Sequence, residues 1–321
     1  MRLCKKAAAA LLAAVMAVSM LTACSGASVG GGGSAGGGST GGGNNPGGGS
    51  STVEPAPEPD DVILPGSGDD GQEGAKKTPI EKSKSKLYAF NEKAKNAAEI
   101  YAEETIGVYN ADGKAVSSEK ITVAYADSGV YEKISEEGVE LEQVFQKNGE
   151  KYDEYVLSSA DKAAVKIAEV PGDEMEKVKV GYKLPDTGIY STTVKVHSID
   201  YYAETYTNDG VEYTVCFEND MPKYEFDQYP SQGTQYIVYN AFQFGTGSSR
   251  GLCKLPAGTK VYTEGSESNK LKDENGNEYQ VTMNKGNDGN ITSVTVTDKN
   301  NNDVTNQFKW VLKFAQIGII S

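Results

Sequence analysis

Histidine occurs once in the 321 residues, tryptophan once and cysteine four times. Because His197 is the one imidazole, a mechanism that needs two histidines is excluded. The cysteines lack the paired Cys/His spacing of zinc ligands. His197 lies in the strand-like segment 194–199, where we expect it to be solvated or packed. The sequence therefore predicts a protein that is not an enzyme and holds no metal or cofactor.

Basic residues are also scarce relative to acidic ones. Lys and Arg number 31 against 45 Asp and Glu, which leaves a formal net charge of −14. This charge opposes electrostatic binding of nucleic acids and of anionic lipid headgroups. We therefore expect no nucleic-acid partner.

The first 24 residues have the pattern of a secretory signal. Residues 1–6 are short and basic, and residues 7–20 are apolar or small over a length too short to span a bilayer comfortably. The stretch ends in Leu21-Thr22-Ala23-Cys24, which resembles the lipobox of bacterial lipoproteins. The resemblance implies that residues 1–23 are removed and that Cys24 carries a diacylglycerol. We therefore expect a lipid anchor at the extracytoplasmic face of the cell membrane, or at the outer membrane if the cell has one.

Composition divides the rest of the chain into three segments. Residues 24–83 are rich first in Gly and Ser and then in Pro and acidic residues, which is typical of a flexible tether. Residues 84–264 are predicted to form the main folded domain. Residues 265–321 are predicted to form a small β-rich extension that docks on the main domain or continues its sheet, because so short a piece has a marginal core of its own.

A helix is predicted for residues 84–105, followed by a long series of strands. The helical spacing is that of Leu87, Phe90, Ala94, Ala97 and Tyr101. Alternating apolar runs flank Asn148-Gly149 and Asp209-Gly210, and such dipeptides predict β-hairpins. The predicted fold class is α+β, with an N-terminal helix covering a large curved antiparallel sheet and a small all-β extension after it.

Three segments carry a family resemblance. Residues 201–213, 217–224 and 252–261 resemble the paired strands, the following edge and the Leu-Pro-x-Gly closing segment of the bacterial lipoprotein-carrier (LolA/LppX-like) superfamily, in particular its lipid-anchored members on Gram-positive cells. The resemblance implies an open half-barrel whose concave face holds acyl chains. The chain departs from the family at Cys253, where an aromatic residue is expected, and it continues for 57 residues past Glu264.

Five residues are candidates for an apolar ligand face: Tyr213, Val215, Phe217, Tyr224 and Phe226. Residues at alternate positions share one face of a strand. The same side chains could equally fill an ordinary core. The predicted function is binding or carriage of a hydrophobic or acylated ligand. The alternative is a cell-surface module that binds a glycan or a protein through an aromatic sheet face, because tyrosine is favoured at interfaces.

Cys216 and Cys253 remain after the signal cysteines are set aside, and they either form a disulfide or stay as two buried thiols. Residues 298–302 begin like a calcium loop, but Asp303 stands where glycine is needed and Lys309 where a bidentate Glu is needed, so a polar turn is predicted. Near the C-terminus, four large apolar residues are predicted to share one strand face: Phe308, Trp310, Leu312 and Phe314.

Overall fold

The structure is a computed structural model that describes residues 54–64, 76–136, 138–175, 181–230, 232–267, 269–287 and 289–320. The predicted signal, the predicted lipidation residue Cys24 and the glycine-rich segment lie outside these ranges. Their assignments remain predictions.

The described chain forms 17 strands and three short α-helices. The strands are β1 (Val62–Ile63), β2 (Thr78–Pro79), β3 (Glu99–Tyr109), β4 (Ala115–Ala126), β5 (Gly129–Glu136), β6 (Val139–Asn148), β7 (Lys151–Ser158), β8 (Ala163–Pro171), β9 (Tyr190–Val196), β10 (Ile199–Asn208), β11 (Val211–Glu218), β12 (Met221–Tyr229), β13 (Gly233–Phe244), β14 (Lys260–Glu264), β15 (Lys270–Asp273), β16 (Glu278–Lys285) and β17 (Ile291–Thr297). The helices are α2 (Lys86–Asn96), α3 (Gly172–Met175) and α4 (Trp310–Gln316), and 3-10 turns occupy η1 (Pro59–Asp61), η2 (Lys82–Lys84) and η4 (Thr305–Gln307).

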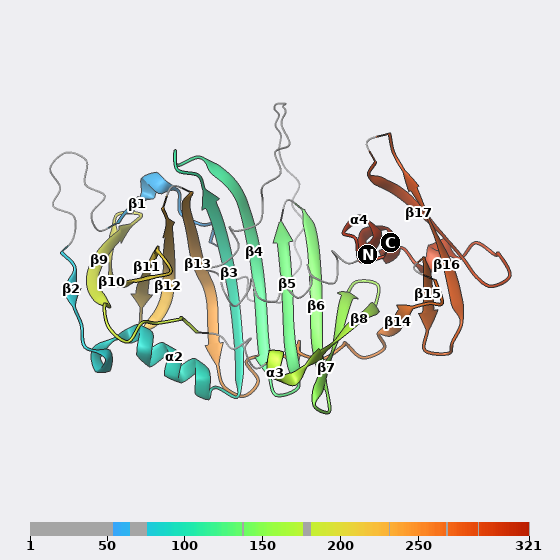
Figure 1. The fold of residues 1–321 in the computed structure, drawn as a ribbon, viewed down its shortest axis with the longest axis horizontal. Helices are drawn as coiled ribbons and strands as arrows, with labels where there is room; N and C mark the ends of the chain where they lie inside the picture. Colours follow the sequence, from blue (N-terminus) through green and yellow to red (C-terminus); the bar gives the residue numbers. More distant parts are fainter. Residues whose placement is uncertain are drawn as a thin grey trace, which may run out of the picture.

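Strand pairing produces one large mixed sheet. It runs from β9 through β10, β11, β12 and β13 to β3, then through β4 to β8, and on to β14, β15, β16 and β17. The short strands β1 and β2 both pair with β9. All of these pairings are antiparallel except that of β8 with β14. Figure 1 shows the sheet extending from β9 at one end of the molecule to β16 and β17 at the other.

The predicted α+β class is wrong. The structure is mostly this sheet, with three short helices among the described residues, and no helix spans residues 84–105. Helix α2 stops at Asn96, Ala97 is extended, and β3 begins at Glu99. The strand contains Ile100, Thr105 and Ile106, whose branched β-carbons favour extended backbone. The helical spacing of Ala97 and Tyr101 is therefore a coincidence, since Ala97 follows α2 and Tyr101 lies in β3.

Two predicted hairpins are confirmed by the pairing. Asn148 is the last residue of β6 and Gly149 begins the turn to β7, and Asp209-Gly210 joins β10 to β11. Asp209 and Gly210 both have positive φ, at 50° and 82°, which a tight turn between right-twisted strands requires. Local sequence was sufficient here because the turn geometry depends on these two residues alone.

The C-terminal segment continues the sheet from β8. Strand β14 pairs with β8 in parallel, and α4 packs with both in one core cluster. The strand predicted for 308–314 is wrong because these residues form a turn and α4. Trp310, Val311, Phe314 and Ala315 are the buried residues of α4 and lie on one helical face, and Val311 and Ala315 break the alternation that a strand would need.

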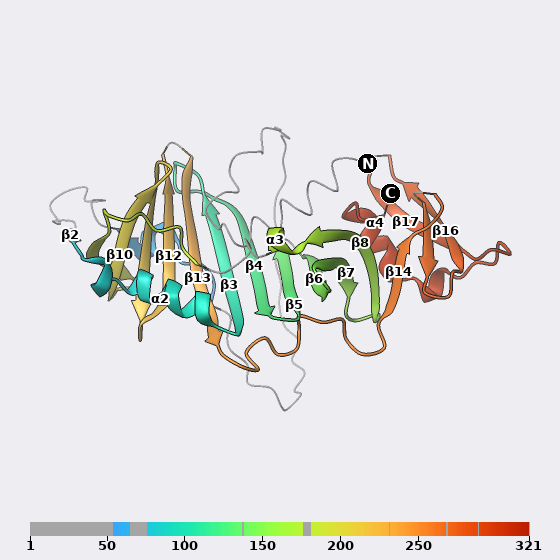
Figure 2. The same cartoon turned by 60° about the horizontal axis from the view of Figure 1, so that its bottom comes forward.

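Both faces of the sheet carry core clusters. On one face, α2 covers part of β10–β13, as the turned view shows (Figure 2). On the opposite face, residues 54–64 of the predicted tether pack against the sheet through Ala56, Val62 and Leu64. The register of pairing places α2 and α4 on the same face, toward opposite ends of the sheet (Figure 1). We call this face the α2-facing side.

Candidate functional site

Glu204 of β10 holds the N-terminus of α2 against the sheet. Its Oε1 accepts the Lys86 N–H at 2.7 Å and the Tyr202 hydroxyl at 2.9 Å. Its Oε2 accepts the Ser85 hydroxyl at 2.6 Å and the Leu87 N–H at 3.1 Å. The first N–H groups of a helix lack intrahelical acceptors and attract negative charge. The fully buried Glu204 carboxylate therefore fixes both the position and the direction of α2.

The five predicted ligand-face residues do not share one face. Tyr213, Val215 and Phe217 pack in a core cluster with Leu87 of α2. Tyr224 and Phe226 lie in the cluster on the opposite face. The cause is the register, because Cα partners in a pair point to the same side and Tyr224 is the partner of Cys216 rather than of Val215 or Phe217. All five are buried, so they fill cores, and none forms an open aromatic surface.

Between the apolar residues, the α2-facing side carries a group of buried acidic and phenolic side chains, which we call the acid–tyrosine cluster. Its members are Glu104, Tyr182, Tyr206, Glu225, Asp227 and Tyr239. The Tyr239 hydroxyl donates to Glu225 and lies 3.1 Å from the Tyr182 hydroxyl. Tyr182 is positioned by Asn91 of α2, whose side chain accepts its N–H and donates to its carbonyl, both at 2.8 Å.

Burial shifts the carboxyl groups of this cluster toward their protonated form. It raises the pKa of Glu104 to about 8, with the Glu225 carboxyl as a second cause. Burial also raises the pKa of Glu225, and it raises the pKa of Asp227 well above the ordinary value, with Glu225 adding to that effect. Among the ion pairs of the described residues, none joins these three groups to Lys, Arg or His. Burial without a counter-charge favours the neutral acids.

Some of these polar atoms are left without a hydrogen bond. Oε2 of Glu104 and both carboxyl oxygens of Asp227 are buried and meet no partner in hydrogen-bonding geometry, although Glu225 lies near enough to couple with Asp227. Unsatisfied buried polar groups are costly, so each one is a candidate for a functional role. A protonated Glu104 can donate its hydrogen bond to a carbonyl or hydroxyl oxygen of a ligand.

A second polar row crosses β5, β6 and β7 on the same face. Glu132 is the partner of Gln143, whose side-chain N–H donates to Glu154 at 3.3 Å. Burial raises the pKa of Glu132 to about 8, and Glu154 contributes to this shift. Burial alone raises the pKa of Glu154 to about 7. Within the described residues, no group of three His, Cys, Asp or Glu side chains is arranged to hold a metal ion.

An apolar cluster lies beside these acids, which we call the strand cluster: Ile106, Ile121, Val123, Ile237 and Tyr239. All of its buried members and all of the apolar residues packed on it come from strands β3, β4, β5 and β13. The buried residues of α2 belong to two neighbouring clusters, and those of α4 to the cluster at the far end. Among the described helices, therefore, none contributes a residue to the strand cluster.

The predicted disulfide is absent. Cys216 and Cys253 are both free and buried. They belong to different core clusters, Cys216 to the one under residues 54–64 and Cys253 to the one that contains Tyr131 and Tyr155. The structure therefore contains two separately buried thiols, which was the alternative to the disulfide.

The segment that begins like a calcium loop is a polar turn. Oδ1 of Asp298 accepts the N–H of Asn300 at 2.8 Å and of Asn302 at 2.9 Å, and its Oδ2 accepts the Asn302 side chain. Asp273 makes the same set of bonds with Asn275 and Asn277. Both carboxylates are thus committed to their own turns.

The residues 247–251 have the Gly-x-Ser-x-Gly spacing of some serine hydrolases, but their environment does not suit that chemistry. The Ser249 hydroxyl donates to Oε2 of Glu99 at 2.7 Å, and the same oxygen accepts the N–H groups of Gly247 and Ser249. The one histidine, His197, lies at the turn between β9 and β10, with its Nδ1 3.5 Å from Asp61. His197 therefore does not provide a base for Ser249.

Among the described residues, no helix has both the length and the apolar character needed to cross a bilayer.

Comparisons with known proteins add little. No protein-family model and no curated protein matches the chain. Among solved structures, the chain is similar to a DUF1329 family protein from Desulfovibrio piger, with a TM-score of 0.24 and 11% sequence identity over 55% of this chain and 98% of that chain. A similarity at this level carries no argument. The resemblance to lipoprotein carriers and the lipobox therefore remain predictions from the sequence.

The acid–tyrosine cluster and the polar row were not predicted from the sequence. Their acids alternate with apolar residues, as in Tyr224, Glu225, Phe226 and Asp227, and this pattern normally indicates a strand with one solvated face. Here both faces are covered, so the acids are buried as fully as the aromatic residues. One available signal was the number of acids in consecutive strands without matching basic residues.

Proposed function

We propose that this protein is a lipid-anchored extracytoplasmic protein that binds a hydrophobic or acylated ligand on its α2-facing side. The observation that carries the proposal is the strand cluster, an apolar part of the sheet to which no described helix contributes. Its five central members are buried, so a ligand binds there by displacing the side chains that now pack on them. The mechanism is apolar burial and involves no catalytic step.

The neighbouring acids suit the polar end of such a ligand. Glu104 lies directly opposite Ile121 of the strand cluster and opposite Tyr239, which belongs to both groups. Its pKa of about 8 means that at neutral pH it is mostly protonated and can donate to the carbonyl oxygen of an ester or amide. An acyl chain over the isoleucines would place its carbonyl group near this donor.

Acyl binding is expected to weaken when Val123 is replaced by threonine. The substitution keeps the shape but puts a hydroxyl among Ile106, Ile121 and Ile237, which makes contact with an acyl chain less favourable. Affinity for a fluorescent fatty acid, measured by titration, is expected to fall about five- to tenfold. The matched control is Val116→Thr in the same strand, at a position that is 62% exposed, and its affinity is expected to be unchanged.

Native mass spectrometry of Cys24→Ser protein complements the titration. Lipid that co-purifies with this unacylated protein supports the proposal. The absence of any bound lipid, together with equal affinities of the two threonine variants for the fatty acid, contradicts it. Circular dichroism establishes that both variants remain folded.

Membrane attachment is expected to depend on Cys24. Two acyl chains on this residue give stable anchoring, whereas the unmodified chain has none. In cells, Cys24→Ser is expected to move the protein from the membrane fraction to the soluble fraction and to abolish incorporation of radiolabelled palmitate. Val116→Thr serves as the control and stays in the membrane fraction. Palmitate labelling that persists without Cys24 would show that the anchor lies elsewhere.

A further inference from the structure

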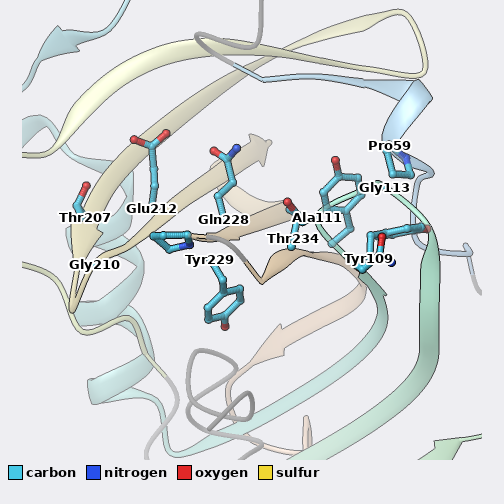
Figure 3. A pocket seen from close by; sticks show the side chains of 14 residues that line it. Pro59, Tyr109, Ala111, Gly113, Thr207, Gly210, Glu212, Gln228, Tyr229 and Thr234 are labelled. Carbon is cyan, nitrogen blue, oxygen red and sulfur yellow. The ribbon is translucent and has the colours of Figure 1, made fainter. Parts of the chain in front are cut away.

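A pocket of about 550 Å³ lies on the face of the sheet opposite the α2-facing side, at the strand ends away from α2. It is bordered by the β3–β4 turn, the β10–β11 turn, the β12–β13 turn and Pro59 of η1 (Figure 3). All three turns join strands that are neighbours or next neighbours in the sheet. Its volume is in the range of small-ligand sites.

The floor of the pocket contains one row of residues across five adjacent strands. The row runs from Thr207 of β10 through Glu212, Gln228 and Thr234 to Tyr109 of β3, each residue being the direct cross-strand partner of the next. All five line the pocket. Because neighbouring strands lie about 4.8 Å apart, the row presents a hydroxyl, a carboxylate, an amide, a second hydroxyl and an aromatic ring at regular intervals.

Several of these polar groups are available to a ligand. The side chains of Thr207, Gln228 and Thr234 make no hydrogen bond to any described residue, and each of them is at least partly exposed. Glu212 is held by Lys77, whose Nζ lies 2.7 Å from Oε2 and 2.8 Å from Oε1. The row thus contains free donors and acceptors beside one fixed ion pair.

Fixed aromatic rings form the wall at one end of the row. Tyr109 and Tyr236 have ring centroids 5.1 Å apart, and Phe226, the cross-strand partner of Tyr236, meets its ring in a T-shaped contact at 5.0 Å. The Tyr109 hydroxyl donates to the Pro57 carbonyl at 3.1 Å, which holds the ring in place. Both tyrosines are largely buried and line the pocket with the part of the side chain that stays exposed. Because the rings are held rigidly, contact with this part comes at little entropic cost.

The surroundings disfavour anionic and purely apolar ligands. Glu58 and Asp61 are close enough to raise the pKa of Tyr109 after burial, and Asp60 acts on Tyr236 in the same way. These acids repel anions, and the nearby Lys77 is already paired. The polar row, in turn, would be left unsatisfied under an apolar ligand.

We propose that this pocket binds a neutral sugar chain, with hydroxyl groups of successive residues bonded along the row from Thr207 to Thr234 and a sugar ring against the tyrosine wall. Alternating donors and acceptors match hydroxyl groups, which both donate and accept. The proposal does not depend on acyl binding, because the pocket and the strand cluster lie on opposite faces of the sheet.

The test is titration of the protein with N-acetylchitohexaose and maltohexaose, followed by saturation-transfer NMR. Binding of at least one of these neutral oligosaccharides is expected, with affinity reduced about tenfold or more in Gln228→Ala. Gln243→Ala is the matched control, since Gln243 is an exposed residue of β13 outside the pocket, and its affinity is expected to equal that of the unmodified protein. Tri-galacturonate serves as the anionic probe and is expected not to bind.

Three results would overturn the sugar site. They are absence of binding by both neutral oligosaccharides, equal affinity of Gln228→Ala and Gln243→Ala, and tighter binding of tri-galacturonate than of the neutral probes. Thermal unfolding of the two alanine variants separates a lost contact from a lost fold. If Gln228→Ala does not fold, Thr234→Val replaces it, because this change removes a hydroxyl of the same row and little volume.

Discussion

Replacement of Glu204 by glutamine is expected to lower the free energy of unfolding by about 2–3 kcal/mol, and replacement by alanine by about 4 kcal/mol. The carboxylate accepts four hydrogen bonds, two of them from the first N–H groups of α2. In glutamine, an NH₂ group takes the place of one oxygen and faces donors. The measurement is denaturation by urea, followed by circular dichroism.

The matched control for this prediction is Glu218→Gln, which changes an exposed acid at the end of β11. Its unfolding midpoint is expected to stay within experimental error of the unmodified protein. Loss of the hydrogen bonds between Glu204 and the N-terminus of α2 also frees this helix. Glu204→Ala is therefore expected to expose Leu87 and to increase the binding of a hydrophobic dye. Equal midpoints for Glu204→Ala and Glu218→Gln would mean that Glu204 does not anchor α2.

Raising the pH from 5 to 9 is expected to destabilise the protein by several kcal/mol. Glu104 and Glu132 have pKa values of about 8 in the folded state, against 4.5 as the ordinary value. Between these two pH values the folded protein binds more protons than the unfolded chain, so the free energy of unfolding falls as pH rises. Since one pKa unit corresponds to about 1.4 kcal/mol, a single such carboxyl contributes about 4 kcal/mol.

The decrease in the free energy of unfolding is expected to begin above about pH 5 and to level off above the folded-state pKa of about 8. Acids with lowered pKa values, such as Glu54 and Asp153, do not obscure it, because their stabilising effect is complete above about pH 5. Urea denaturation at a series of pH values measures the slope. Glu132→Gln is expected to make the slope shallower by about one proton, whereas the exposed Glu92→Gln leaves it unchanged. A stability that is constant from pH 5 to 9 would show that these carboxyls are solvated.

The sequence predicted the features that depend on neighbouring residues. The hairpins at Asn148-Gly149 and Asp209-Gly210 are correct because positive φ within a tight turn, at Gly149 in the first and at Asp209 and Gly210 in the second, depends on the local residues. The polar turn at Asp298 is correct for the same reason, since its bonds lie within five residues. A large sheet made mainly of antiparallel neighbours also followed from these local signals.

Features that depend on distant partners were beyond the sequence. The faces of Tyr213 and Tyr224 are set by the register between β11 and β12, which shifts at Cys216/Phe217. The burial of Glu104 and Glu225 depends on what covers the sheet, and strand alternation alone gives no information about that. The row from Thr207 to Tyr109 also depends on distant partners, since it joins β3 to the four strands β10–β13, which lie far from β3 in the sequence.

The pairing of β3 with β13 has a consequence for the order of folding. Strand β3 pairs with β4 on one side, which follows it in the chain, and with β13 on the other, which is made far later. A chain that crosses a membrane from its N-terminus, as the predicted signal implies, presents β3 as an open edge until residues 233–244 have emerged. Open edges invite pairing with other chains, and closure over so long a separation is slow. If the chain is exported in this way, the interval before β13 arrives is when it is most exposed to aggregation and most dependent on help from chaperones.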